Sequence, residues 1–168
     1  VTKIFDKEGN LLTIIFFSND ENSRFYRYYD ENLNLAIDVN CIDGKCIQKG
    51  YYSDKKLAYI KEGKLTENLD VLANGKYTEY YKNGKILMRT PFKNSLKSGK
   101  MEAFYESGKI KVEIPYNRGV VDGIAKEYFE SGRLAKEIHY KNGKEMFYKS
   151  YFDNDNKQEK EKYSEIYR

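Results

Sequence analysis

The chain has 168 residues, with 17 Tyr, 9 Phe, no Trp and 2 Pro, and its 30 basic and 26 acidic residues give a net charge of +4. The two signs of charge are interleaved without a run of five like charges, which argues against a nucleic-acid-binding stripe and favours a solvated surface of mixed charge. No stretch approaches the ~18 apolar residues of a membrane-spanning helix, so we expect no transmembrane segment.

A repeat of about 24 residues dominates the middle of the chain. Three segments align without gaps; each has two aromatic residues, two polar residues, a glycine, a basic residue and an aliphatic residue. The segments are 80–86, 104–110 and 128–134. Their glycines, each 24 residues from the next, are Gly84, Gly108 and Gly132. A second set with the same spacing is Gly75, Gly99 and Gly123. This in-phase similarity predicts stacked copies of one supersecondary unit.

Degenerate copies extend the repeat towards both ends. Residues 5–11 resemble the pattern, 28–32 carry Asn32 where the glycine belongs, and 51–57 carry Lys55 there. Residues 151–155 resemble a last copy. We therefore predict a single repeat domain over 1–168 with about seven hairpin units. Its regular core is 72–145, its degenerate amino-terminal repeats are 1–71, and its carboxy-terminal cap is 146–168.

Each copy predicts a hairpin rather than a helix. The Asn-Gly or Ser-Gly turn supplies positive φ, and the following residues alternate with period two, as in Ile110, Val112 and Ile114 against Lys111 and Glu113. The sequence thus predicts an all-β fold, an elongated antiparallel meander of hairpins. We expect the apolar run 11–17 to be a buried strand, and 157–168 to be a short helix or a frayed cap.

The pattern of two aromatic residues, x-x-Gly-Lys-Ile/Leu, x-x-Glu, Tyr and then a pair of glycines resembles the bacterial variant of the MORN repeat. It is most complete from Gly99 through Tyr140, and the resemblance covers about 72–145 well. The resemblance implies an extended sheet of hairpins, protein–protein or membrane-associated scaffolding, and no catalytic residues. It also implies bacterial relatives that are often exported or surface-associated, some of them described as antitoxin-like.

The aromatic pairs are the best binding candidates and also the best packing candidates. Adjacent strand residues point to opposite faces, so one member of each pair should pack in the seam between repeats and the other should lie on the second face. The candidate residues are Tyr80, Tyr81, Phe104, Tyr105, Tyr128 and Phe129. A row of such rings on a sheet suits contact with a protein or a glycan, although packing alone also explains them.

The single histidine, His139, gives no sign of a metal site or of catalysis. Its repeat positions one and two copies earlier hold Pro115 and Pro91, which indicates a strand end or an exposed edge. We expect His139 to be a solvated structural residue, and we expect no metal and no cofactor, because no second histidine is present and the cysteines lie far away in sequence.

Two carboxylates also recur at one repeat position. Glu113 and Glu137 are 24 residues apart, with Arg89 in the matching place one copy earlier. Stacked strands would turn these residues into a charge ladder, whereas a paired-carboxylate hydrolase would need a particular separation that the repeat does not indicate. The glycines from Gly119 to Gly123 lack the pattern of a phosphate-binding loop and are interpreted as turn positions.

Cys41 and Cys46 flank a strong two-residue turn signal, Asp43-Gly44. In that register the cysteines are a directly opposite, non-hydrogen-bonded pair with Cα atoms about 4.5 Å apart, within the ~4.4–6.8 Å range of disulfides. A disulfide would indicate an oxidising compartment. The alternative is a reduced pair in a cytoplasmic protein.

We therefore expect a non-enzymatic protein–protein interaction or scaffolding module, secreted or at the cell surface of a bacterium, with interaction with a host as one use. The chain begins at Val1 without Met, so we expect that a signal segment has been removed. The alternatives are a carbohydrate-binding module of a cell wall or host surface, an antitoxin-like partner-binding protein and, more remotely, a hydrolase. Open sheet edges near Thr2 to Phe5 suggest a homodimer.

Overall fold

The computed structural model describes residues 2–17, 23–30, 32, 34–67, 70–153 and 164–165. Every regular element in this part of the chain is a β-strand, and neighbouring strands pair in antiparallel fashion, which confirms the all-β hairpin prediction. The chain forms two compact units, Val1–Lys85 (unit 1) and Ile86–Arg168 (unit 2), and each is described by itself. The prediction of a single repeat domain over 1–168 remains a prediction.

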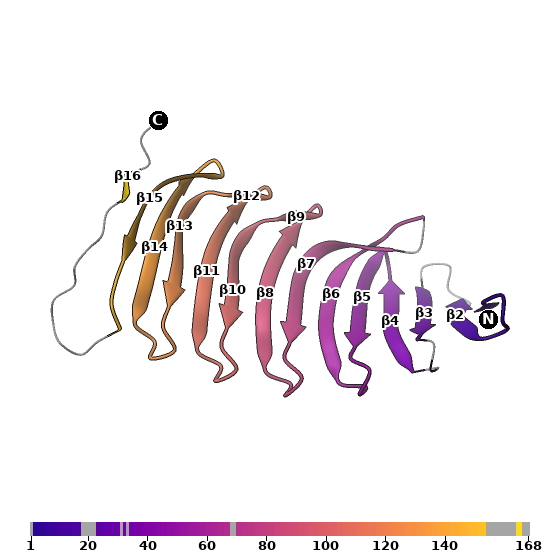
Figure 1. Ribbon diagram of the computed structural model, residues 1–168. Helices are drawn as coiled ribbons and strands as arrows, with labels where there is room; N and C mark the ends of the chain where they lie inside the picture. The colour runs from indigo at the N-terminus through magenta and orange to yellow at the C-terminus, as the bar shows by residue number, and fades with distance from the viewer. Residues whose placement is uncertain are drawn as a thin grey trace. The chain divides into compact units, whose positions relative to one another are not determined.

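Unit 1 is a meander in which consecutive strands pair (Figure 1). Its strands are β1 (Thr2–Phe5), β2 (Leu11–Phe17), β3 (Ser23–Tyr29), β4 (Leu35–Ile42), β5 (Lys45–Tyr51), β6 (Leu57–Leu65) and β7 (Val71–Tyr80). The four residues of β1 are exposed, and β1 pairs with β2. Dimerisation through this strand remains a prediction.

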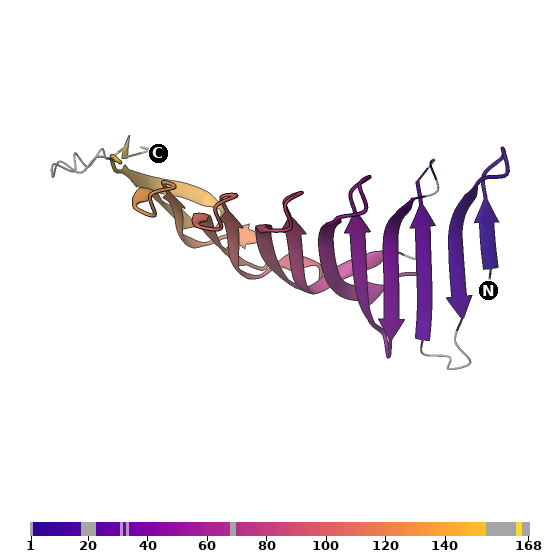
Figure 2. The same ribbon diagram turned by 90° about the horizontal axis from the view of Figure 1, so that it is seen from below.

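Unit 2 has the same organisation, with two short extra strands, β9 and β12, at one end of the long strands (Figure 1). Its strands are β8 (Ile86–Lys93), β9 (Leu96–Lys97), β10 (Gly99–Phe104), β11 (Ile110–Asn117), β12 (Val120–Val121), β13 (Gly123–Tyr128), β14 (Leu134–Lys141), β15 (Lys144–Ser150) and β16 (Ser164–Glu165). The pairing order is β8-β10-β11-β13-β14-β15-β16, with β9 beside β8 and β12 beside β11. Figure 2 shows the strands of unit 2 side by side from below.

The carboxy-terminal segment from Lys157 was expected to be a short helix or a frayed cap. The two residues of this segment that the structure describes form a strand instead. Ser164 and Glu165 form β16, which pairs with Tyr148 and Phe147 of β15. These two residues therefore cover part of the β15 edge with backbone hydrogen bonds, as an exposed strand edge requires. The other residues of this segment lie outside the described part of the chain.

The turns at Gly84, Gly108 and Gly132 are confirmed. The N–H of Gly108 donates to the carbonyl of Tyr105 at 2.8 Å, the N–H of Tyr105 donates to Lys109 at 2.9 Å, and Gly108 has φ 91°. The same pair of bonds occurs at the other two glycines. A positive φ at this position is unfavourable for residues with a Cβ, which explains the recurring glycine.

Two degenerate turns show how the repeat tolerates other residues. Lys55 takes the glycine position with φ 68°, and its N–H donates to Tyr52 as the glycines do. In the second copy the closing bond runs from the N–H of Asp30 to Asn34, so this turn lies one residue later than the sequence alignment predicted. Asn32 is therefore not at the glycine position; that place falls on residue 33, which is outside the described residues.

Of the two glycines interpreted as turn positions, Gly119 lies in a turn and Gly123 does not. Gly99 and Gly123 begin strands β10 and β13, with φ of 104° and 117°. A Cβ built on Gly99 would lie 3.2 Å from Cγ of Pro91, and one on Gly123 would lie 3.2 Å from Cγ of Pro115. These glycines are needed because the strand passes close to a proline ring of the preceding strand.

The real second turns have two residues, both with positive φ. They are Asn94-Ser95, Arg118-Gly119 and Asn142-Gly143. Two positive φ values define the type I′ turn, whose twist matches that of the flanking strands. In unit 2 these turns lie at the opposite ends of the strands from the turns at Gly108 and Gly132 (Figure 1).

Each unit has a thin core on one side of its sheet. In unit 1 the buried apolar residues are Tyr26, Val39, Cys41, Cys46 and Val71. In unit 2 the buried residues are Thr90, Met101, Ala125 and Ile138. We call the side of each sheet that carries these residues its core face and the opposite side its outer face. Directly opposite residues on paired strands share a face, so the strand registers assign the remaining residues.

Candidate functional site

The outer face of unit 2 carries one continuous row of charged residues across six strands. Each member lies directly opposite the next on the neighbouring strand. In order, the row is Arg89, Glu102, Glu113, Lys126, Glu137 and Lys149. The period-two alternation predicted that Glu113 and Glu137 would form a ladder, and the structure places both in this row, which we call the ionic row.

Lysines neutralise the carboxylates of the ionic row. Lys100 forms ion pairs with Glu113 and, at 3.3 Å, with Glu102, so it bridges two like charges that lie opposite each other. Lys126 pairs with Glu137 at 3.7 Å. The hydrogen bond from Lys100 is the largest effect that lowers the pKa of Glu113 below its usual value. Glu113 is thus held as a charged, paired group, which is the opposite of a general acid with a raised pKa.

Beside the ionic row, the outer face of unit 2 carries a band of apolar side chains, which we call the apolar band. Its members come from β8, β9, β11, β12, β13 and β15. They are Pro91, Leu96, Pro115, Val120, Ile124 and Phe147. Leu96, Val120 and Ile124 are 48%, 43% and 43% exposed. The band is therefore available to another molecule, and the ionic row lies along one side of it.

The type I′ turns set the distance between successive side chains of the apolar band. A Cβ placed on Gly119 would lie 3.4 Å from Cδ2 of Leu96, and one on Gly143 would lie 3.0 Å from Cγ1 of Val120. Each aliphatic side chain thus lies against the glycine of the next hairpin. These residues are 24 apart in sequence, so one repeat sets the spacing along the band.

His139 lies at the end of this band and is partly exposed. Its ring stacks on Phe147, with centroids 4.0 Å apart and planes at 18°. It lies opposite Ile124 on β13. The structure therefore gives His139 a packing contact on the outer face, where the sequence predicted only a solvated strand residue.

In two of the three aromatic pairs, the first member contacts the ionic row. The guanidinium carbon of Arg89 is 5.4 Å from the ring centroid of Phe104, and the hydroxyl of Tyr128 donates to Oε2 of Glu113 at 2.9 Å. The Phe104 ring, which has no hydroxyl, thus meets an arginine of the row, and the Tyr128 hydroxyl meets a glutamate. Burial is the largest effect that raises the pKa of Tyr128, followed by its bond to Glu113.

The second member of the pair joins neighbouring repeats. The hydroxyl of Tyr105 donates to the carbonyl of Tyr128 at 2.7 Å, and that of Tyr52 donates to the carbonyl of Tyr80 at 2.6 Å. The amine of Lys111 lies 5.4 Å from the centroid of the Tyr105 ring. All six candidate residues are partly buried: Tyr80, Tyr81, Phe104, Tyr105, Tyr128 and Phe129. Whether any of them binds a partner remains a prediction.

Sequence reasoning missed a second aromatic row as a distinct feature, on the core face of unit 2. Its members, again 24 apart, are Phe92, Tyr116 and Tyr140. Tyr116 lies opposite Gly99, and Tyr140 lies opposite Gly123, where the ring covers a position without a side chain. The amine of Lys97 lies 4.9 Å from the ring centroid of Tyr116. The spacing was the signal that could have revealed this row.

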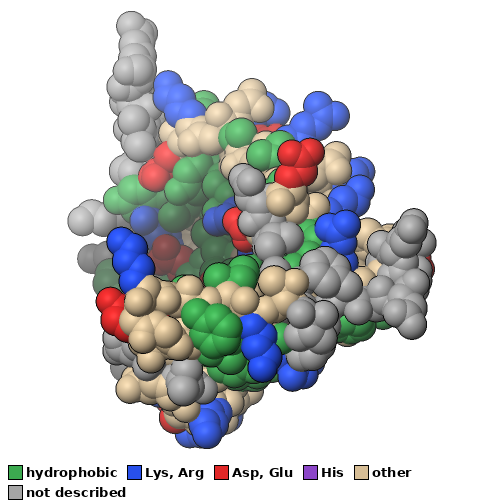
Figure 3. Space-filling view, turned by 90° about the vertical axis from the view of Figure 1, so that its right-hand side faces the viewer, with side chains coloured by type: hydrophobic (Ala, Val, Ile, Leu, Met, Phe, Trp, Pro, Cys, Tyr) green, Lys and Arg blue, Asp and Glu red, His purple; other side chains and the backbone are tan. Residues whose placement is uncertain are grey.

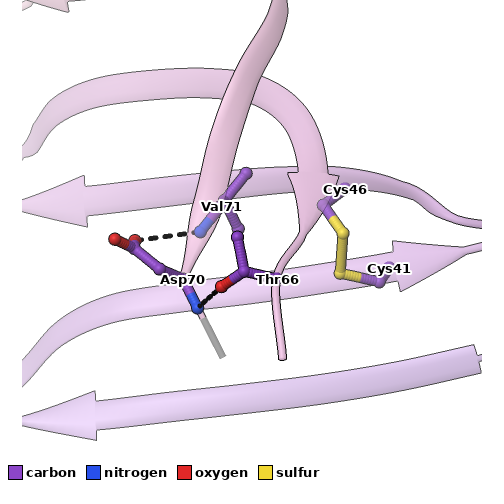
Figure 4. The surroundings of a disulfide bond; sticks show 5 residues. All are labelled: Cys41, Cys46, Thr66, Asp70 and Val71. Atoms are coloured by element: carbon purple, nitrogen blue, oxygen red, sulfur yellow. Dashed lines mark hydrogen bonds between the residues drawn. A yellow bond between two sulfur atoms is a disulfide. The ribbon is translucent and has the colours of Figure 1, made fainter. Parts of the chain in front are cut away.

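Cys41 and Cys46 are directly opposite in the β4–β5 hairpin, in the predicted register, and form a disulfide with S–S 2.04 Å and Cα–Cα 4.0 Å. Both are buried. Val71, at the start of β7, packs in the same core cluster (Figure 4). Its N–H donates to Oδ1 of Asp70 at 2.9 Å (Figure 4). The end of the β6–β7 hairpin thus covers the disulfide.

Several kinds of site are absent from the described residues. They contain no group of three or more His, Cys, Asp or Glu side chains that could hold a metal ion. No helix long and apolar enough to cross a membrane occurs among them. On the face drawn in Figure 3, basic and acidic side chains both occur among hydrophobic and other ones, so the visible surface carries both signs of charge.

Comparison with known proteins agrees with the repeat seen in the structure. The family model described as MORN repeat variant matches residues 73–94, 97–118 and 121–142. The three matches end at the first residue of the three type I′ turns, Asn94, Arg118 and Asn142. A search of curated proteins finds no match to this chain. Residues 73–142 are therefore three tandem MORN repeat variants.

Proposed function

We propose that this chain is a non-enzymatic interaction module that binds a protein partner through the apolar band of unit 2. MORN repeats are commonly modules for interaction with proteins or membranes, which supports a scaffolding role over catalysis. The observation that carries the proposal is the partial exposure of Leu96, Val120 and Ile124 in one band beside the ionic row.

This arrangement has the chemistry of a protein interface. Interface cores are depleted in charge and rich in aromatic and apolar side chains, whereas their rims are polar and hydrated. The apolar band supplies such a core, with Phe147 and the prolines as rigid members. The ionic row supplies a rim whose charges already have partners, so a partner covering the band need not bury unpaired charges.

Quantitative affinity capture tests the proposal. Immobilised wild-type protein and the double variant Leu96→Ser/Ile124→Ser are compared with the double variant Leu72→Ser/Ile42→Ser, whose aliphatic side chains are equally exposed but lie in unit 1. We expect a protein that binds saturably to the wild type and to the unit 1 variant, with affinity at least about tenfold weaker for the band variant. Equal capture by both double variants would contradict the proposal.

We also propose an oxidising location, secreted or at the cell surface. The support is the buried Cys41–Cys46 disulfide, because such bonds persist outside reducing compartments. The assay of free thiols described in the Discussion tests this second proposal without reference to the first.

A further inference from the structure

A separate hollow lies on the outer face of unit 1, between β3 and β4. Its volume is about 400 Å³, and it is lined by Phe25, Arg27, Asp38 and Asn40. Phe25 lies directly opposite Asn40, and Arg27 lies directly opposite Asp38. The residues between them, Tyr26 and Val39, point into the core, so these four side chains all belong to the outer face.

The hollow combines one aromatic ring with three planar polar groups. Arg27 is an N–H donor, Asp38 is an acceptor, and the amide of Asn40 is both. Arg27 Nε and Asp38 Oδ1 are 3.3 Å apart, with the side chains 50% and 31% exposed, so a ligand can reach both. The volume falls within the ~300–1,000 Å³ range of small-molecule sites.

This set of groups matches one class of ligand. A pyranose ring presents an apolar C–H face that packs on an aromatic ring, and a rim of hydroxyls that both donate and accept hydrogen bonds. Phe25 can receive the apolar face while Arg27, Asp38 and Asn40 contact the hydroxyls. The lining contains one cation and one anion that compensate each other, which favours a neutral sugar over an acidic one.

We propose that the hollow formed by Phe25, Arg27, Asp38 and Asn40 binds a pyranose ring of a neutral saccharide. This site is in unit 1 and does not depend on the protein-binding role of the apolar band in unit 2. The chain would then carry a sugar site and a protein-binding surface on different sets of strands.

Saturation-transfer NMR with the full chain tests the proposal. The probes are the neutral oligosaccharides maltotetraose, cellotetraose, chitotetraose and mannotetraose, with sialyllactose and trigalacturonate as acidic probes, all at millimolar concentration. We expect transfer to at least one neutral probe, and titration calorimetry should then show binding at least about tenfold weaker in Asn40→Ala and in Phe25→Ala. Asn40 is exposed, so its variant should keep the fold even if the Phe25 variant does not.

Arg24→Ala is the matched control for Arg27→Ala, because Arg24 is an exposed arginine of the same strand but lies opposite Cys41, on the core face. Arg24→Ala should leave the affinity unchanged, and Arg27→Ala should weaken it. The proposal is overturned if no neutral probe binds, if only the acidic probes bind, or if Asn40→Ala binds as tightly as the wild type.

Discussion

The hydroxyl of Tyr105 donates a 2.7 Å hydrogen bond to the carbonyl of Tyr128, and so joins one repeat to the next. Tyr52 makes the same bond to Tyr80 in unit 1, at 2.6 Å. In a repeat protein each unit is stabilised mainly by its neighbours, so contacts of this kind contribute to the interface between repeats. At least part of the aromatic pattern in the sequence therefore has a packing role.

Replacement of Tyr105 with Phe should lower the free energy of unfolding by about 1 kcal/mol, because the carbonyl of Tyr128 loses a partly buried donor. Urea denaturation measures the change. Tyr116→Phe is the control, because the hydroxyl of this partly buried tyrosine makes no hydrogen bond within the described part of the chain. If both variants lose the same stability, the bond between the repeats contributes nothing specific.

Replacement of Lys55 with Gly should raise the free energy of unfolding by about 0.5–1 kcal/mol. Lys55 has φ 68°, where a Cβ costs ~1–2 kcal/mol, and the greater flexibility of glycine in the unfolded chain offsets part of the gain. Lys56→Gly, at the next position, should instead destabilise the protein. Thermal denaturation of both variants and the wild type measures these changes. A melting temperature below that of the wild type for Lys55→Gly would refute the turn assignment.

Replacement of Gly108 with Val should cost about 1–2 kcal/mol. A Cβ at this position would meet no atom within 4 Å, so the cost comes from φ of 91° and not from a clash. Gly108→Asn should cost less, since asparagine tolerates positive φ better. Equal melting temperatures for the wild type and the valine variant would contradict this explanation.

Glu113 should stabilise the protein only above mildly acidic pH. Its pKa is lowered in the folded protein, mainly by Lys100, so its contribution is complete above the unfolded pKa of about 4.3 and is lost as the pH falls through the folded pKa. The wild type should therefore melt higher than Glu113→Gln near neutral pH, and the difference should shrink as the pH approaches about 3. The exposed Glu130→Gln serves as the control, and a difference independent of pH would exclude the ion pair as its cause.

Protein purified from its native compartment without reductant should contain no free thiol after denaturation, because Cys41 and Cys46 are joined. Reduction should lower the free energy of unfolding by about 2 kcal/mol, as the chain-entropy model gives for so short a loop. An Ellman assay in denaturant measures the thiols. Two free thiols per chain would contradict both the disulfide and the proposed oxidising location.

The features that the sequence predicts best are local. The glycine turns and the Cys41–Cys46 register follow from a few adjacent residues, because positive φ and period-two alternation are properties of the backbone. Gly123 was misassigned because its spacing cannot distinguish a turn from a strand that passes close to Pro115. That distinction depends on which strand is the neighbour.

The candidate sites were less predictable because they depend on contacts between distant residues. The hollow at Phe25 and Asp38 needs the β3–β4 register, which brings side chains of two different strands together. Likewise, the cover that Val71 places over the disulfide depends on how the β6–β7 hairpin packs. The apolar band could have been found from the alignment of Leu96 with Val120, 24 residues apart, once the type I′ turns were recognised.

Hydrogen–deuterium exchange of the protein alone and with its captured partner tests the central claim most directly. Binding through the apolar band predicts that the partner slows exchange in peptides covering Leu96–Lys97, Val120–Val121 and Gly123–Tyr128, with no change in unit 1. Protection confined to β3 and β4, or absent from all three peptides of the band, would contradict the claim that this surface of the MORN repeats binds the partner.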